Sequence, residues 1–504
     1  MLDWYSGEFN LIMYDRDVHP QDRSKLVLQL RPPNLEKIIG GVKMELVQLA
    51  KPSETELEPL LQLSIRQNVL NEFVRQQLLR DPRDVQAQLD EVAQLMVELD
   101  SAAAISSRMT PNTTYMTFKQ LFEAIPQLDL RGFLNAGLST VYHWAEEDTV
   151  SIQNFEYLAR LANIMASTSR RAVANYLLTV TAMNLKQYSY FPSEQFSWRE
   201  CVEQLSQLEV VSKLYIEQFR RFDRSEVSQY LQTLKTDFLS THRNTPLQYL
   251  STINRLGFYV GFPKRLLDED SVWMPLSQLS LDLTDYFNSI VRVSKEERNF
   301  ALSQIGTYLD SDDAPKFPVL SADMLFDPHL GAIVLPMSFL QAPIYVPGDD
   351  VPMYGVYSSL GVTVLQMIAK VFWQGVNQNS QLQCLDNVFR GFLGPDRQNS
   401  VNLDKDLIYT IELSDAFKTT LYGYAKWQND HSIHHEKTLP AYDKFDSISS
   451  LIVTFSTLFC NLEGIEPGSD YEAMMNTVAS NSRQYSINFH CSNSSRIFNR
   501  RTCV

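Results

Sequence analysis

A helical spacing of apolar residues recurs along most of this chain and is the feature that most constrains its fold. In DVQAQLDEVAQLMVEL, residues 84–99, apolar side chains return every three to four positions, which places them on one stripe of a helix. Similar stripes run through NFEYLARLANIM (154–165), RAVANYLLTVTAM (171–183) and EVVSKLYIEQFRRF (209–222). We therefore predict a mainly α fold whose helices bury these faces in a core.

Two short regions favour strands instead. Between Ser6 and Pro32, GEFNLIMYDRD and KLVLQLRP alternate apolar and polar residues on either side of the turn formers VHPQDRS, which predicts a β-ribbon. GAIVL, residues 331–335, is a short apolar run that stops at Pro336 and predicts a buried strand. The fold class is thus mainly α with small β elements.

Length and composition favour two lobes. A chain of 504 residues with 44% hydrophobic content exceeds the size of a usual single core. Composition shifts at YVGFPKRLLDEDSVWMP, residues 259–275, where Pro and acidic residues are typical of a connection. We predict a mostly helical N-terminal lobe over residues 1–260 and a C-terminal lobe over residues 261–504.

The charge balance excludes one class of partner. A formal net charge of −15 and a pI near 5.1 argue against nucleic acid, whose binding needs clustered Lys and Arg. No window reaches the roughly 18 to 20 uninterrupted apolar residues of a membrane span. The segment after Met1 has neither the basic start nor the apolar stretch of a signal peptide.

Common catalytic motifs are absent from the sequence. It contains no GxSxG, phosphate-binding loop, GxGxxG or HExxH. The segment HSIHHE offers His431, His434, His435 and Glu436, which could meet at a metal if the segment were helical. It has no apolar stripe, so we expect an exposed loop or frayed helix end.

Several stretches, in order over nearly the whole chain, resemble the neprilysin and endothelin-converting-enzyme family of zinc metallopeptidases. MTFKQLFEAIPQLDLRGFLN (116–135) is similar to the family's MTLxxLxxxxPxxxWxxFLN. VGFP (260–263) resembles IGYP, and GAIVLPMSFLQAPIY (331–345) resembles NEIVFPAGILQPPFY. The closing NSRQYSINFHC (481–491), followed by Cys503, resembles NSxxFxxxFxC…C.

The resemblance implies a two-lobed neprilysin-like ectodomain with a thermolysin-like C-terminal lobe. It also implies an extracellular or cell-surface setting, zinc as the family's cofactor and peptides as its substrates. The family's N-terminal portion, which carries the cytoplasmic tail, anchor or signal, has no counterpart here, and we expect it to be missing upstream of Met1.

The family's zinc-binding helix, IGHEITHGFDD, corresponds to LGVTVLQMIAK in this chain. Aligned on Gly361, the two His ligands become Val362 and Gln366, and the general-base Glu becomes Thr363. Val has no lone pair, a Gln carbonyl is a weak zinc ligand, and Thr is no carboxylate base near neutral pH. We expect Leu360, Val364, Met367, Ile368 and Val371 to form one apolar stripe instead, which Val362 extends.

Other catalytic positions implied by the resemblance also differ. The family's third ligand Glu and its supporting Asp align with Tyr409 and Leu413, although Glu412 lies three residues from Tyr409. The transition-state His and substrate-binding Arg align with Gly468 and Met474, while Asn476 is retained. The remaining candidates for a substrate cleft are Asp323, Gln341 and Asn476.

The resemblance also implies covalent features. Cys384 and Cys503 are expected to form a disulfide, and the family's partners of Cys201, Cys460 and Cys491 would lie upstream of Met1; a Cys491 to Cys503 bridge is the alternative. Asn112 and Asn493 have the form of glycosylation acceptors.

Three functional hypotheses follow. The leading one is a catalytically inactive pseudopeptidase, without zinc, that binds peptides or a protein partner. The second is an active zinc metalloendopeptidase that cleaves extracellular peptides through a rearranged site such as the His431 cluster. The third is a non-functional fragment. The sequence names no ligand or oligomeric state.

Overall fold

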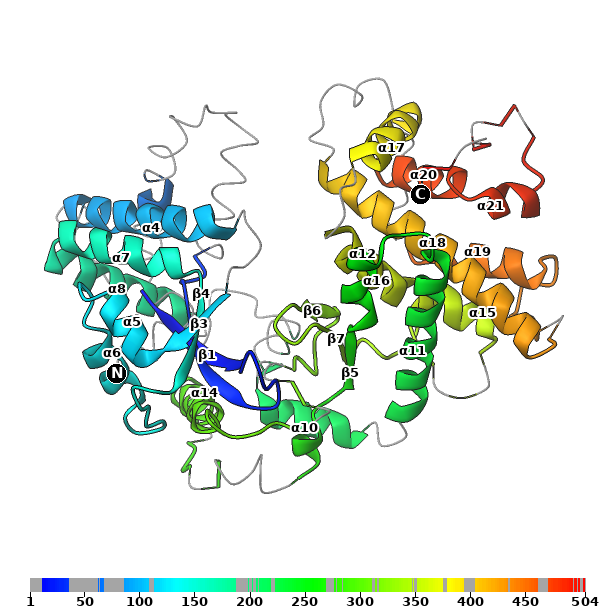
Figure 1. The fold of residues 1–504 in the computed structure, drawn as a ribbon. Helices are drawn as coiled ribbons and strands as arrows, with labels where there is room; N and C mark the ends of the chain where they lie inside the picture. Colours follow the sequence, from blue (N-terminus) through cyan, green and yellow to red (C-terminus); the bar gives the residue numbers. More distant parts are fainter. Residues whose placement is uncertain are drawn as a thin grey trace. The chain divides into compact units, whose positions relative to one another are not determined.

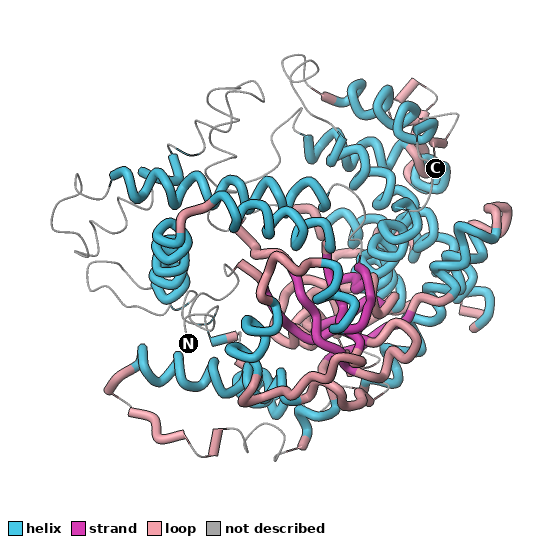
Figure 2. The backbone as a smooth tube through the Cα atoms, turned by 60° about the vertical axis from the view of Figure 1, so that its left-hand side comes forward, coloured by secondary structure: helices cyan, strands magenta, loops and turns pink. Residues whose placement is uncertain are grey.

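The computed structural model describes most of the chain: residues 11–35, 62, 64–67, 86–107, 113–186, 198, 202, 205–206, 208–218, 223–268, 276–277, 279–282, 284–310, 313–314, 317–346, 348, 351–374, 379–393, 404–433, 436–460, 470–492, 494–495, 497–498 and 502–503. Helices make up most of the described chain (Figure 2). Two small sheets accompany them, of four and of three strands. The predicted fold class, mainly α with small β elements, is therefore confirmed.

The described chain divides into two compact units. Unit 1 comprises residues 1–213 and 264–311, and unit 2 comprises residues 214–263 and 312–504. This differs from the single boundary that we predicted between residues 260 and 261, because residues 264–311 return to unit 1. Each unit is described separately below.

Unit 1 is built on a four-stranded sheet of order β1-β2-β4-β3 (Figure 1). Its strands are β1 (Met13–Val18), β2 (Leu26–Arg31), β3 (Thr113–Thr117) and β4 (Thr149–Gln153). β1 and β2 pair antiparallel, with Met13 opposite Arg31 and Val18 opposite Leu26, so the predicted β-ribbon is confirmed. Both strands are buried along most of their length, Leu28 and Leu30 completely, rather than on alternate residues.

The helices of unit 1 bury the stripes seen in the sequence. They are α4 (Gln86–Ser107), α5 (Phe118–Ala124), α6 (Leu130–Leu138), α7 (Phe155–Ser167), α8 (Arg170–Lys186), α10 (Glu209–Gln218, in which the unit boundary falls), η3 (Lys264–Leu267) and α14 (Tyr286–Ser303). α4 packs on α7 and α8, and Leu89, Val92, Met96 and Leu99 of its stripe are buried in one core with Leu158 and Leu161 of α7. Burial of these faces stabilises the helices far more than their intrinsic propensity does.

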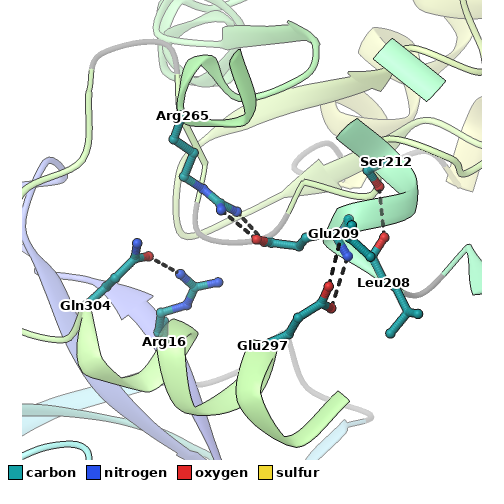
Figure 3. Close-up of polar contacts among 8 residues, drawn as sticks. Arg16, Leu208, Glu209, Ser212, Arg265, Glu297 and Gln304 are labelled. Carbon is teal, nitrogen blue, oxygen red and sulfur yellow. Dashed lines mark hydrogen bonds and ion pairs between the residues drawn. The ribbon is translucent and has the colours of Figure 1, made fainter. Parts of the chain in front are cut away.

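A group of charged side chains explains why residues 264–311 belong to unit 1. Arg265 of η3 forms a two-pronged ion pair with Glu209 at the start of α10, and Glu297 of α14 accepts hydrogen bonds from the backbone N–H of Glu209 and of Val210 (Figure 3). Arg16 of β1 donates to Gln304 just after α14. These contacts link positions up to 288 residues apart, so no local composition shift could have placed the boundary.

Unit 2 has a smaller sheet and a larger helical core. Its strands β5 (Gly257–Gly261), β6 (Leu325–Asp327) and β7 (Ala332–Pro336) lie in the order β5-β7-β6, with β5 parallel and β6 antiparallel to β7. All five residues of β7 are buried, which confirms the strand predicted at GAIVL and its end at Pro336.

The helices of unit 2 surround a pair at its centre. They are α11 (Arg224–Thr241), α12 (Leu247–Asn254), α15 (Met353–Val356), the π-helical turn η4 (Tyr357–Gly361), α16 (Val362–Gln374), α17 (Asn379–Phe392), α18 (Asp404–Asp430), α19 (Ser447–Thr457), α20 (Asp470–Ser480) and α21 (Arg483–Asn488). α16 packs lengthwise on α18, and α11 and α12 also contact α16 (Figure 1). The residues aligned with the family's zinc site lie on this central pair.

Candidate functional site

The run from α15 to α16 is an apolar core element. Leu360, Val364 and Ile368 are fully buried, and Val371 is nearly so, as the predicted stripe requires. Met367 is an exception, because it is only partly buried and packs against the edge of the core. Among the described residues, the run Met353–Gln374 is long and apolar enough to cross a membrane, but 72% of its apolar window is buried inside the protein, as in a core helix.

A π-helical turn interrupts this run at the start of the aligned zinc-binding segment and includes its first two residues, Leu360 and Gly361. Such turns insert an extra residue into a helix and often occur at functional sites. At its end, a Cβ on Gly361 would come within 2.8 Å of the Tyr230 hydroxyl, so glycine leaves the room that this tyrosine occupies. The turn is thus fitted against α11.

Of the three residues aligned with the zinc-binding motif, Val362 and Thr363 have structural roles in the fold. Val362 is 1% exposed and belongs to the core of unit 2. The Thr363 hydroxyl donates to the carbonyl oxygens of Ser359 (2.9 Å) and Leu360 (3.0 Å), one turn back on its own helix. Gln366 is partly buried. None of the three carries an imidazole or a carboxylate.

On α18, the residues aligned with the family's third zinc ligand and its supporting Asp, Tyr409 and Leu413, are also uncharged. Tyr409 is 39% exposed, and Leu413 is buried. Glu412 lies between them and is buried. This burial raises the pKa of its carboxyl to about 7, although the positive charge of Lys370 of α16 acts to lower that pKa. Glu412 is therefore a buried carboxyl on α18 that lies near enough to Lys370 of α16 to be influenced by its charge.

This donor set does not fit zinc. Structural and catalytic zinc sites take three or four His, Cys or carboxylate ligands, whereas these positions provide one carboxyl and one carboxamide. Within the part of the chain that the structure describes, no three His, Cys, Asp or Glu side chains are grouped as a metal site would need.

The second metal candidate, the His431 cluster, is only partly described. His431 is exposed, its Nδ1 lies 2.9 Å from the Trp427 carbonyl oxygen, and its ring stacks on Trp427 at 4.9 Å. Glu436 accepts from the backbone N–H of Met353 (2.7 Å) and Tyr354 (3.2 Å) and from the Tyr424 hydroxyl (2.6 Å), so it positions the start of α15. His434 and His435 lie outside the described residues.

The other predicted site residues do not form one described cluster. Met474 is buried on α20, and Asn476 is partly buried on the same helix. Asp323 is exposed, whereas Gln341 donates to the Met337 carbonyl oxygen at 3.2 Å. No hydrogen bond or ion pair joins Asp323, Gln341 and Asn476 within the described chain, and Gly468 lies outside it.

The expected disulfide is present. Cys384 and Cys503 are bonded, with Cα atoms 5.6 Å apart, which rules out the alternative bridge from Cys491 to Cys503 in this structure. Cys460 and Cys491 are free thiols. Cys201 and the two glycosylation candidates, Asn112 and Asn493, lie outside the described residues.

A cavity in unit 2 has no counterpart among the predicted site residues. It has a volume of about 870 Å³ and is lined by residues of α11 and of the C-terminal half of α18, by residues 345, 346, 348, 351–353, 356 and 357, and by residues 431, 433, 436 and 437. An ion pair between buried Asp237 of α11 and partly exposed Lys426 of α18 lies in its wall, with Nζ and Oδ1 2.8 Å apart. Their separation of 189 positions, on two helices with ordinary apolar stripes, gave no sequence signal.

Comparison with known proteins supports the resemblance noted in the sequence. Residues 7–245 match peptidase family M13. Neprilysin-21 of Caenorhabditis elegans is 19% identical over 436 residues, which cover 76% of this chain. The match spans only 56% of the length of that curated relative.

Solved structures share the fold over nearly the whole chain. The zinc metalloprotease Zmp1 of Mycobacterium tuberculosis, in complex with an inhibitor, superposes with a TM-score of 0.69 at 15% identity, covering 99% of this chain and 81% of Zmp1. PepO of Lactobacillus rhamnosis gives 0.65 at 13% identity, with 99% and 82% covered. The Haemonchus galactose-containing glycoprotein complex gives 0.68 at 14% identity, with 100% and 82% covered.

Together, the match of residues 7–245 to peptidase family M13, the similarity to Neprilysin-21 and the fold shared with Zmp1 and PepO make this chain similar to the neprilysin-like peptidases in sequence over its N-terminal part and in fold over nearly its whole length.

Proposed function

We propose that this chain is an extracellular, catalytically inactive neprilysin homologue that binds a peptide or protein partner without hydrolysing it. One observation carries the proposal: the positions that correspond to the family's two His ligands and general base hold Val362, Gln366 and Thr363, and two of the three are committed to the fold. Without strong nitrogen donors the helix pair does not hold zinc tightly. Without zinc, the pKa of the attacking water stays near its bulk value, which slows hydrolysis by many orders of magnitude.

The alternative is an active zinc metalloendopeptidase with a rearranged site. The observation that favours it is Glu412, a buried carboxyl on α18 whose pKa of about 7 suits a general base. Such a site would still need metal ligands, and the described residues that face Glu412 include Lys370, a cation, which opposes metal binding.

Metal analysis and a cleavage assay separate these two functions. The full chain is dialysed against zinc, freed of excess metal and analysed for zinc per chain, and the same sample is then incubated with a mixed peptide pool with and without a chelator. The proposal expects far less than one zinc per chain and no chelator-sensitive cleavage. The same two measurements are made on the variants Gln366→Ala and Glu412→Gln.

Two outcomes would overturn the proposal. Stoichiometric zinc that survives dialysis is one. Cleavage that disappears with the chelator and with either variant is the other, and it would establish the rearranged enzyme. A functional but inactive homologue must still bind a peptide or protein partner. The proposal therefore also expects the immobilised chain to retain individual peptides from the pool.

A further inference from the structure

One cluster of side chains in unit 1 joins the segments next to which the chain passes between the two units. The chain leaves unit 1 after residue 213, returns at residue 264 and leaves again after residue 311. Glu209 of α10 precedes the first of these crossings, Arg265 of η3 follows the second, and Glu297 of α14 precedes the third. A change within this cluster therefore acts on the segments through which the chain enters and leaves unit 1.

The arginine of this cluster is committed to one of its two carboxyl groups. Arg265 forms a two-pronged ion pair with Glu209, in which Nη1 lies 2.7 Å from Oε2 (Figure 3). Arg16 of β1, the other cation close to Glu209, donates to Gln304. Within the part of the chain that the structure describes, no Lys, Arg or His lies within ion-pair distance of Glu297. Glu297 is therefore a carboxyl beside another carboxyl, without a cation of its own.

Glu297 holds the start of α10 through both of its carboxyl oxygens. Oε2 accepts from the backbone N–H of Glu209 at 3.0 Å, and Oε1 accepts from that of Val210 at 3.1 Å. These two N–H groups belong to the first turn of α10, where a helix has no carbonyl oxygens of its own to offer them. Glu297 thus caps α10 from a different helix, α14, and loss of its two hydrogen bonds frees the first turn of α10.

The two carboxyl groups differ in ionisation because of this arrangement. Burial acts to raise the pKa of Glu209, but the hydrogen bond and the charge of Arg265 outweigh it and hold that pKa below its usual value. Burial raises the pKa of Glu297 to about 7, and the negative charge of Glu209 adds to the rise, while the two backbone N–H groups and the charge of Arg265 oppose it. Of the two carboxyls, only Glu297 therefore changes its charge near neutral pH.

We propose that Glu297 is a pH-sensitive latch, which holds the first turn of α10 on α14 in its protonated form and releases that turn on ionising. The sign follows from proton binding. A carboxyl that release exposes to water has an ordinary pKa of 4.5, below that of the latched carboxyl, so rising pH favours the released form. Release loosens the segment through which the chain first leaves unit 1, whether or not the chain hydrolyses peptides.

Hydrogen exchange of the full chain, followed by mass spectrometry between about pH 5 and about pH 8, tests the proposal. Each exchange rate is divided by the intrinsic rate of an unstructured chain at the same pH. We expect the protection of the first turn of α10 to fall roughly tenfold to a hundredfold over this range in the wild type. Glu297→Gln keeps a hydrogen-bond acceptor but does not titrate, so its protection should not change with pH. The matched control Glu296→Gln should keep the pH dependence of the wild type.

Two further measurements separate release of the latch from unfolding of unit 1. Release exposes little surface, so low concentrations of urea should hardly change exchange in the first turn of α10, whereas they should accelerate exchange in the core helix α7. Glu209→Gln removes the charge that opposes ionisation and frees Arg265, so the midpoint of release should move to lower pH.

Four outcomes overturn the proposal. They are protection of α10 that does not change with pH in the wild type, wild-type pH dependence in Glu297→Gln, an unchanged midpoint in Glu209→Gln, and exchange in α10 that accelerates with urea as steeply as exchange in α7. The last outcome would mean that the start of α10 opens only when unit 1 unfolds.

Discussion

Oδ2 of Asp415 lies 3.1 Å from Nε2 of His242, deep inside unit 2, and accepts a further hydrogen bond from Nε1 of Trp373 at 3.0 Å. Asp415 is on α18, Trp373 is on α16, and His242 caps the C-terminus of α11, so one carboxylate joins three helices. The His242 ring also stacks on Phe238 at 4.3 Å. This contact connects the two helices, α16 and α18, whose residues align with the family's zinc site.

Removing this carboxylate should destabilise unit 2 strongly. Asp415 is fully buried, so Asp415→Leu leaves His242 and the Trp373 N–H without their acceptor, and we expect a loss of about 3 to 5 kcal/mol in the free energy of unfolding. Urea denaturation followed by circular dichroism measures it.

The control for this loss is Asp386→Asn on α17. Asp386 pairs with Arg390 one turn away, both side chains are about a third exposed or more, and such pairs contribute less than about 1 kcal/mol. Equal effects of the two substitutions would mean that the buried contact does not hold the helices together.

Glycine at position 423 is required by its neighbours rather than by its backbone. A Cβ there would lie 2.7 Å from Asp237 Oδ2 and 3.1 Å from Tyr357 Cε1, and both side chains are held in place. We expect Gly423→Ala to lower the melting temperature although alanine favours helix by about 1 kcal/mol. Thermal unfolding measures the change.

Gly391 of α17 offers the matched substitution, because a Cβ added there meets nothing within 4 Å. Gly391→Ala should therefore raise stability by about 0.5 to 1 kcal/mol. A stabilising Gly423→Ala would show that Asp237 and Tyr357 move aside freely.

The elements that sequence reasoning found are those with local causes. The stripes of α4 and α7, the ribbon of β1 and β2, and the β7 strand each follow from side-chain periodicity within one segment. The disulfide between Cys384 and Cys503 came from family resemblance, since spacing alone does not specify connectivity.

Features that depend on distant contacts were not predictable. The return of residues 264–311 to unit 1 depends on pairs such as Arg16 with Gln304, and the cavity depends on Asp237 with Lys426. Met367 was placed in the buried stripe by its spacing, but it lies at the margin of the core. Glu412 had a weak signal, its distance of three residues from Tyr409, but its burial came only from the structure.

The disulfide should contribute substantially to the stability of unit 2. It joins residues 119 positions apart, and on a chain-entropy model closing such a loop stabilises the folded chain by about 4 to 5 kcal/mol. We expect Cys384→Ser, or mild reduction of the wild type, to lower the urea midpoint. Cys460→Ser is the control, because Cys460 is a free and exposed thiol, and its substitution should leave the midpoint unchanged. A midpoint that reduction does not alter would contradict this assignment.

Glu297 should make unit 1 less stable as pH rises. Burial raises the pKa of its carboxyl from 4.5 to about 7, although its hydrogen bonds from the backbone N–H of Glu209 and Val210 oppose the rise. Between these values the folded chain keeps a proton that the unfolded chain has lost, so the free energy of unfolding falls as pH rises from about 4.5 to about 7 and then levels off.

Glu297→Gln does not titrate and removes this dependence. Relative to the wild type, its free energy of unfolding should therefore increase by on the order of 1 to 3 kcal/mol between about pH 5 and about pH 8, measured by urea denaturation at each pH. Comparing the variant with the wild type cancels the contributions of the other titrating groups, Glu412 among them, to the pH dependence of stability. Glu296→Gln, the same substitution one residue earlier, controls for the loss of a carboxyl on α14. If the difference in free energy of unfolding between Glu297→Gln and the wild type did not change with pH, the Glu297 carboxyl would already be ionised at pH 5. Its burial would then be shallower than the structure shows.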